Sequence, residues 1–221
     1  NIVGTSQAIA MGGYGAVFLP DSGPGVIPFA SESADGLPDH EQLTQEFRLE
    51  SDNDGPFNWQ AGLFWFREEI TIHGFNYDSL APGNPQAGFA VQQQENTAWA
   101  VFASGEYDAT DRLKLRGGLR YTRDRKDFAA QVLEAAPFGA PVGGPYRVHT
   151  DANDVSWDAS VVYAVNEDVN LYARVAKGFR APSIQGRLLF ADPGAPNGGV
   201  TTADSEEVLS WELGLKADTA P

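Results

Sequence analysis

Apolar and polar side chains alternate with a period of two through several segments of this chain, which is typical of β-strands with one face of each kind. Residues 113–124 show the pattern most clearly. One face carries Leu113, Leu115, Gly117, Leu119 and Tyr121. The other carries Lys114, Arg116, Gly118, Arg120, Thr122 and Asp124, so that every charge except Arg123 lies on one side. The same split at residues 209–216 predicts an all-β fold with almost no helix.

Seven segments follow this pattern to different degrees. The predicted strands are residues 43–51, 57–70, 96–107, 113–124, 155–163, 169–179 and 209–216. Several of them are about 9 to 12 residues long, which suits a tilted crossing of a bilayer better than the usual soluble strand of about 5 or 6 residues. The residue before proline leaves regular structure, so Arg180, ahead of Ala181 and Pro182, predicts the end of a strand.

The connections between these strands alternate between two lengths. Short polar turns are expected at residues 52–56, 108–111 and 165–168, and long connections at residues 72–95, 125–154 and 181–206. Barrels of the bacterial outer membrane have short periplasmic turns and long outer loops. The pattern therefore predicts an antiparallel up-and-down transmembrane barrel with Asp52, Asp108 and Asn166 on the periplasmic side. Tyr107, Tyr121 and Tyr163 near strand ends fit the aromatic girdles of such barrels.

Composition narrows the class of protein further. The 221 residues have a formal net charge of -15, which disfavours binding to nucleic acid. The chain has no cysteine, so disulfides, thiolate metal sites and cysteine nucleophiles are absent. No run of about 18 uncharged apolar residues predicts a transmembrane helix, and barrel strands need none. The start shows neither an initiator methionine nor an export signal, so a processed or truncated N-terminus is expected.

An ordered series of segments resembles the β-barrel region of TonB-dependent outer-membrane receptors. The segments are QEFRLES (45–51), GPFNWQAGLFWFREE (55–69), VFASGEYDATDRLKLRGGLRYTRDRK (101–126), VNLYARVAKGFRAPSIQGR (169–187) and SEEVLSWELGLKAD (205–218). The resemblance implies part of a barrel of about 22 strands in the outer membrane of a Gram-negative bacterium. It divides the chain into residues 1–42, an outer loop or poorly ordered segment, and residues 43–221, part of the barrel.

The resemblance also implies the activity and the partners. Members of the family import scarce nutrients, most often ferric siderophores and sometimes haem, cobalamin or carbohydrates. Ligand binds outside, and an inner-membrane energy-transducing complex, the TonB complex, pulls on an N-terminal box joined to a plug inside the barrel. Nothing in residues 1–40 resembles that box or plug, so the chain is expected to be a slice truncated at both ends. The partners implied are outer-membrane lipid, the TonB complex through the missing region, and a small-molecule ligand.

Polar side chains opposite the apolar face of the strands are expected to point into the barrel lumen. These candidates are Glu46, Arg48, Lys114, Arg116, Arg120, Asp158, Arg174, Glu212 and Lys216. A charge ladder inside a wide barrel is usually structural and contacts water or the plug, through exposed pairs worth under about 1 kcal/mol each. Ligand binding is therefore expected mainly from the long outer loops.

Catalytic, metal and cofactor sites are not expected. The histidines His40, His73 and His149 lack the close spacing of a metal site. Asp21, Asp35 and Asp39 lie in or near a Gly/Pro-rich stretch without the calcium-binding pattern of an EF-hand, so solvated loop charge is the simpler interpretation. No nucleophile elbow or phosphate-binding loop is present. The chain is accordingly expected to be neither an enzyme nor a cofactor carrier.

Two other classes share part of the pattern. A soluble secreted β-sandwich that binds carbohydrate also has alternating strands, many aromatic residues and acidic loops, but its apolar faces would be core. A passive porin or an adhesin barrel has the same strands without energy coupling.

Overall fold

The computed structural model describes residues 2–6, 31–52, 54–78, 81–135, 141–186, 188 and 196–217. Among these residues the elements are β-strands apart from a 3-10 turn, η2 (Pro196–Gly199). Within the same ranges, no helix is long and apolar enough to cross a membrane.

Eight strands form one sheet in the order β1-β2-β3-β4-β5-β6-β7-β10, and every neighbouring pair is antiparallel. Their bounds are β1 Ile2–Ser6, β2 Ser31–Glu50, β3 Phe57–Tyr77, β4 Gln86–Thr110, β5 Leu113–Glu134, β6 Gly143–Ala164, β7 Val169–Arg180 and β10 Glu206–Ala217. A small antiparallel pair, β8 (Ser183–Gln185) and β9 (Thr201–Ala203), lies in the connection between β7 and β10. The predicted all-β, antiparallel up-and-down fold is confirmed.

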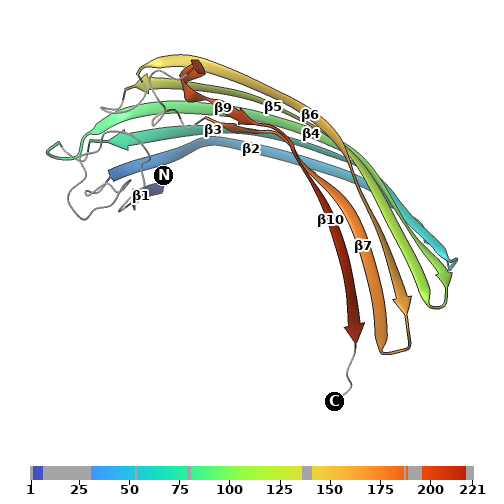
Figure 1. The fold of residues 1–221 in the computed structure, drawn as a ribbon. Helices are drawn as coiled ribbons and strands as arrows, with labels where there is room; N and C mark the ends of the chain where they lie inside the picture. Colours follow the sequence, from blue (N-terminus) through green and yellow to red (C-terminus); the bar gives the residue numbers. More distant parts are fainter. Residues whose placement is uncertain are drawn as a thin grey trace, which may run out of the picture.

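The large sheet is a single curved layer that does not close on itself (Figure 1). The short turns that join β2 to β3, β4 to β5 and β6 to β7 lie at one end of the sheet, and the longer connections lie at the other. This sorting of the connections matches the alternation expected from the sequence.

Most strands are longer than the sequence pattern indicated, and two of the predicted long connections are largely strand. The connection expected at residues 72–95 is wrong in extent, because β3 continues to Tyr77 and β4 begins at Gln86. The connection expected at residues 125–154 is likewise mostly β5 and β6. Paired backbone can extend with polar residues on both faces, and such residues carry no period-two signal.

The N-terminal part of the chain differs in the same way. Strand β2 begins at Ser31, whereas loop was expected to continue to residue 42. Residues 7–30 lie outside the described ranges, so the division of the chain between residues 42 and 43 stays a prediction. The boundary predicted at Arg180 is confirmed, since β7 ends there and Pro182 cannot donate to a ladder.

The register keeps one set of side chains on one face across the whole sheet. Residues paired opposite each other in an antiparallel ladder share a face, and from Leu43 to Lys216 odd positions pair with odd ones except beside bulges near strand ends, as where Tyr77 pairs with Gln86. We call the face of the odd positions the apolar face, because its exposed members are mostly large hydrophobic residues. They are Leu43, Phe47, Leu49, Phe57, Trp59, Leu63, Trp65, Trp99, Val101, Tyr107, Leu115, Leu119, Val155, Tyr163, Leu171, Leu209, Trp211, Leu213 and Leu215.

Burial is inverted relative to that of a soluble protein. Trp211 is 77% and Leu213 is 83% exposed, whereas Ala90, Ala100 and Ala130 are fully buried. In the described part of the chain, no second sheet covers the apolar face. A β-sandwich buries such a face, and contiguous exposed apolar surface of this size marks a lipid or protein contact. The fold therefore gives no support to the soluble sandwich.

The compact core of the structure lies on the opposite face, which we call the polar face. Here Phe128, Ala130 and Val132 of β5 pack with Leu188 and Val200 from the connection between β7 and β10. Ile184 of β8 packs against the same cluster, and Lys126 Nζ donates to the Pro182 carbonyl oxygen over 2.9 Å. This connection is thus folded onto the polar face of the sheet, with β8 and β9 as a hairpin.

Replacement of Gly186 with alanine is expected to disturb that packing. A Cβ atom at Gly186 would lie 2.0 Å from Cζ of Phe128, a buried ring that must then shift. Overpacking of this kind typically costs about 1–3 kcal/mol. We expect Gly186→Ala in the full-length protein to increase proteolytic cleavage within residues 181–205, as followed by mass spectrometry.

Gly178→Ala is the matched control, because a Cβ at Gly178 meets no atom within 4 Å. Its cleavage pattern is expected to equal that of the wild type. Equal protection of the Gly186→Ala variant would show that the hairpin does not pack on Phe128.

Candidate ligand-binding site

All nine polar side chains singled out from the sequence lie at positions of the polar face. Register places Glu46 and Arg48 of β2, Lys114, Arg116 and Arg120 of β5, Asp158 of β6, Arg174 of β7, and Glu212 and Lys216 of β10 there. Whether this face borders a lumen stays a prediction at this point.

Arg120 is the centre of the polar face near mid-sheet. Its guanidinium carbon lies 5.1 Å from the ring centroid of Phe64 and 5.7 Å from that of Phe102, within cation–π range. Asp158 and Arg174 form an ion pair at 3.8 Å on the adjacent strands. Arg120, Asp158 and Arg174 line an open hollow of about 520 Å³ together with Arg116. We call it the arginine hollow.

Gly118 gives room for this arrangement. A Cβ at Gly118 would lie 2.9 Å from Asp158 Oδ1, whereas one at Gly117 would make only ordinary contact. Of the two glycines, only Gly118 is therefore at a position where a side chain would be too close to the carboxylate of Asp158.

The other candidates pair with each other or with residues that the sequence did not single out. Glu46 and Arg48 form an ion pair on β2. Lys114 Nζ lies 2.8 Å from Glu106 Oε1 and 3.3 Å from Asp108 Oδ1. These distances show that most of the charged side chains on the polar face already have an oppositely charged partner within the chain.

At the last strand of the sheet, an aromatic residue connects two of the candidates. The Tyr172 hydroxyl donates to Glu212 Oε1 over 2.8 Å, and Lys216 Nζ lies 5.6 Å from the Tyr172 ring centroid. Tyr172, Glu106, Phe64 and Phe102 were missed because only charged residues within clearly alternating segments were considered. All four lie at even-numbered positions, like the nine predicted residues. Their place in the alternating pattern could therefore have identified them.

A second hollow of about 560 Å³ lies between the polar face and the hairpin of β8 and β9. We call it the hairpin hollow. Its lining includes Asp35, Glu68, Ile70, Ile72, Gln92, Gln93, Gln94, Phe128, Ile184 and Gln185. At its edge, His40 Nε2 lies 3.0 Å from Glu68 Oε1. The glutamine amides, the carboxylates of Asp35 and Glu68, and several apolar side chains can together bind a ligand that is partly polar and partly apolar.

Buried polar groups lie beside the hairpin hollow. Lys126 and Asp124 form an ion pair with side chains only 14% and 12% exposed. In the same cross-strand row, Asn96 Oδ1 and Thr150 Oγ1 are buried, with no hydrogen-bond partner among the described residues. Buried polar atoms normally have hydrogen-bond partners. Asn96 and Thr150 are therefore positioned to form hydrogen bonds with a molecule or segment that is not among the described residues.

The histidines and the early aspartates are dispersed in the structure. His40 pairs with Glu68, His149 pairs with Asp127, and His73 packs edge-on against Phe89. Within the described ranges, no group of three or more potential metal-ligating side chains is found. Asp21 lies outside these ranges, Asp35 lines the hairpin hollow, and Asp39 lines a groove on the apolar side.

Comparisons with known proteins agree with this geometry. The chain is similar to the crystal structure of the ferric yersiniabactin uptake receptor FyuA from Yersinia pestis, with a TM-score of 0.65 and 19% identity. That match covers 86% of this chain and 28% of FyuA, so the chain spans less than a third of the receptor. At this identity the likeness shows the fold alone.

A further match is the ferric-catecholate import receptor Fiu from E. coli K12, with a TM-score of 0.47 and 16% identity, covering 67% of this chain and 26% of that one. A search of curated proteins finds no match. The model of the family described as TonB dependent receptor-like, beta-barrel, matches residues 12–220. Nearly the whole chain is thus matched, and it belongs to the TonB-dependent receptor β-barrel family.

Proposed function

We propose that this chain is part of the barrel wall of an outer-membrane receptor that imports a scarce nutrient in a TonB-dependent manner. The observation that carries the proposal is the inverted sheet, whose large apolar side chains are exposed on one face and whose charged side chains occupy the other. Outer-membrane barrels have lipid on the apolar side and a polar interior. Membership of the family supports the same arrangement.

In this proposal the polar face borders the lumen, and the end of the sheet with the short turns is periplasmic. The arginine hollow then faces the plug region of the whole receptor. The hairpin hollow, at the opposite end, opens toward the outside, where an incoming ligand is first met. The proposed activity is therefore binding and transport, with no catalytic step.

For the substrate we propose a ferric siderophore. The support is the family resemblance, together with FyuA, which is an uptake receptor for ferric yersiniabactin. The TonB complex would act through a region of the receptor outside this chain. A porin or an adhesin barrel has the same wall, so energy-dependent uptake is the property that separates the proposals.

A charge placed in the middle of the apolar face tests the membrane assignment. Leu63 is 54% exposed on that face, and arginine near a bilayer midplane costs about 2–4 kcal/mol in a barrel. We expect Leu63→Arg to lower the unfolding free energy of the full-length receptor by that amount in urea titrations in liposomes.

Gln60→Arg is the matched control on the same strand, because Gln60 lies at a polar-face position. It is expected to change the unfolding free energy by less than about 1 kcal/mol. Equal effects of the two substitutions, or a receptor recovered in the aqueous fraction, would contradict the membrane assignment.

Uptake under iron limitation tests the transport assignment. Gln92 and Gln94 line the hairpin hollow, and loss of two neutral hydrogen bonds to a ligand weakens binding by about tenfold. We expect deletion of the gene to abolish growth on one ferric siderophore, and Gln92→Ala with Gln94→Ala to raise the required concentration about tenfold.

Gln131→Ala is the control, since Gln131 pairs with Val91 at an apolar-face position and does not line the hairpin hollow. Normal growth of the deletion strain on every siderophore tested would refute the proposed substrate class. Uptake that persists after the proton gradient is collapsed would favour a passive porin.

A further inference from the structure

The hairpin hollow has two acidic side chains in its lining, Asp35 of β2 and Glu68 of β3. Glu68 is at a polar-face position, where its register partner on β4 is Asn96. Its Oε1 atom lies 3.0 Å from Nε2 of His40, and the Glu68 side chain is 25% exposed. Histidine is mostly neutral at neutral pH, so this neighbour leaves most of the negative charge of Glu68 in place.

A bulge in β2 brings Asp35 to the same face. The register between β2 and β3 shifts between Gly36 and Asp39, so that Asp35 pairs with Gly74 whereas Asp39 pairs with Thr71. Gly74 is at a polar-face position of β3 and Thr71 is at an apolar-face position. An extra residue in one strand moves the side chains beyond it to the other face. The two aspartates therefore lie on opposite faces, and of the two only Asp35 lines the hairpin hollow.

Among the residues that the structure describes, no lysine or arginine lines the hairpin hollow. The cross-strand row that holds Glu68 and Asn96 continues to Lys126 of β5. Lys126 Nζ is already bound to the carboxylate of Asp124 and to the carbonyl oxygen of Pro182. Its charge is thus balanced by Asp124, and the hollow keeps a net negative charge at neutral pH.

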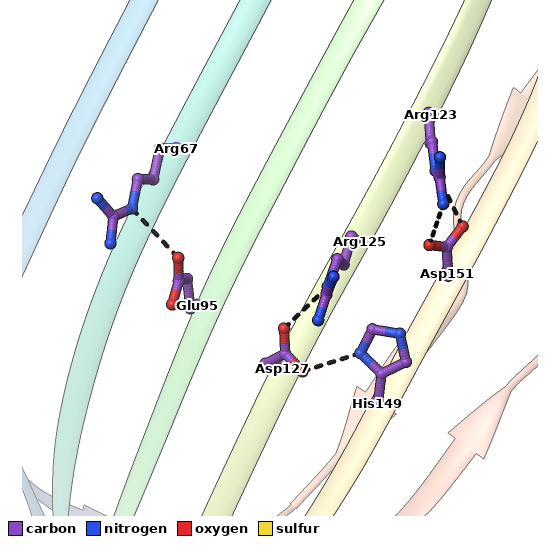
Figure 2. Close-up of polar contacts among 7 residues, drawn as sticks. All are labelled: Arg67, Glu95, Arg123, Arg125, Asp127, His149 and Asp151. Atoms are coloured by element: carbon purple, nitrogen blue, oxygen red, sulfur yellow. Dashed lines mark hydrogen bonds and ion pairs between the residues drawn. The ribbon is translucent and has the colours of Figure 1, made fainter.

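The arginines at this level of the sheet point away from the hollow. Arg67 of β3, and Arg123 and Arg125 of β5, are at apolar-face positions. Each is paired there with a carboxylate, as Figure 2 shows, and the partners are Glu95, Asp151 and Asp127. These guanidinium groups do not line the hollow, and their charges are balanced by carboxylates of their own face.

The uncharged part of the lining consists of amides and aliphatic side chains. The amides include Gln92, Gln94 and Gln185, and the aliphatic side chains include Ile70, Ile72 and Ile184. Phe128 is the one aromatic residue of the described lining, and it is only 8% exposed because it packs in the core cluster. Aromatic ligand groups stack on exposed rings or guanidinium planes, and neither is present here. Amides hydrogen-bond with carbonyl and N–H groups, and isoleucine packs against aliphatic chains.

We propose that Asp35 and Glu68 select the transported ferric complex by its charge, so that neutral or cationic hydroxamate complexes are bound and anionic catecholate complexes are rejected. Three hydroxamate groups cancel the charge of a ferric ion, whereas three catecholates leave three negative charges. Like charges brought together without a counter-ion repel, and this repulsion gives specificity. The aliphatic and amide lining suits the linkers and amide groups of a hydroxamate. The inference rests on the proposed function, because the hairpin hollow must be where the complex binds.

The test measures binding of ferric complexes to the full-length receptor in detergent by quenching of tryptophan fluorescence. The probes are ferrichrome and ferrioxamine B, a neutral and a cationic ferric trihydroxamate, and ferric enterobactin, a ferric tricatecholate. We expect the wild type to bind one of the trihydroxamates at least about tenfold more tightly than ferric enterobactin. This is the effect of three ligand charges repelled by two carboxylates across about 8 Å of screened solution.

Exchange of the two carboxylates for amides of the same shape should remove this discrimination. We expect D35N/E68Q to bind ferric enterobactin about tenfold more tightly than the wild type does, and to bind the trihydroxamates within about twofold of the wild type. The matched control is D39N/E69Q, which removes the same charge from the same two strands at apolar-face positions. Its binding of all three complexes is expected to equal that of the wild type.

The shift of gel mobility on heating verifies the fold of each variant. If D35N/E68Q does not fold, the salt dependence of the wild type serves instead, because screening weakens repulsion. Binding of ferric enterobactin should then strengthen between about 50 and 500 mM sodium chloride, and binding that weakens would contradict the proposal.

Tighter binding of ferric enterobactin than of both trihydroxamates by the wild type would overturn the proposal. Equal affinities of D35N/E68Q and the wild type for ferric enterobactin, or equal gains in the two double variants, would overturn it as well. A folded wild-type receptor that binds none of the three complexes would instead contradict the ferric siderophore of the proposed function.

Discussion

The fold depends on an antiparallel hydrogen-bond ladder whose register, apart from bulges near the strand ends, preserves the face of each side chain from β2 to β10. A slip of one residue between any two strands would move all later side chains to the other face. Because the register holds, Leu63, Val101, Tyr121 and Val155 become neighbours on one surface. Backbone groups in a membrane must be paired internally, and a ladder of this kind pairs them without a helix. The two faces, and hence both proposed binding surfaces, follow from that constraint.

The polar face combines two kinds of site with different chemistry. The arginine hollow near mid-sheet is held by ion pairs and by stacking of Arg120 on Phe64 and Phe102, which makes it a fixed wall. The hairpin hollow is lined by amides and apolar side chains and is roofed by β8 and β9, which Lys126 fastens through the Pro182 carbonyl. In the proposed function, the amide-lined recess captures the ligand outside and the wall borders its passage along the interior.

Much of this organisation could be predicted from residues 113–124 and 209–216, where alternation identifies both the strands and their faces. The nine predicted polar residues all fall on one face, because parity alone decides the face once the register is fixed. The extensions of β3 to β6 past the alternating segments could not be predicted in this way. Residues such as Gln92, Gln93 and Gln94 are polar at every position, so they show no period of two. The packing of Leu188 and Val200 on Phe128 joins residues far apart in sequence, and no local pattern indicates it.

The central claim is that alternate residues of these strands face lipid. The chain has no cysteine, so single cysteines at residues 59–66 of β3 in the full-length receptor can carry spin labels without background substitutions. Accessibility to molecular oxygen and to a water-soluble nickel chelate should then be measured in liposomes. The account predicts that oxygen accessibility is high at positions 59, 61, 63 and 65 and low between them, with the opposite trend for the nickel reagent at positions next to the lumen. Accessibility that does not alternate, or that is high for the nickel reagent at Leu63 and Trp65, would contradict it.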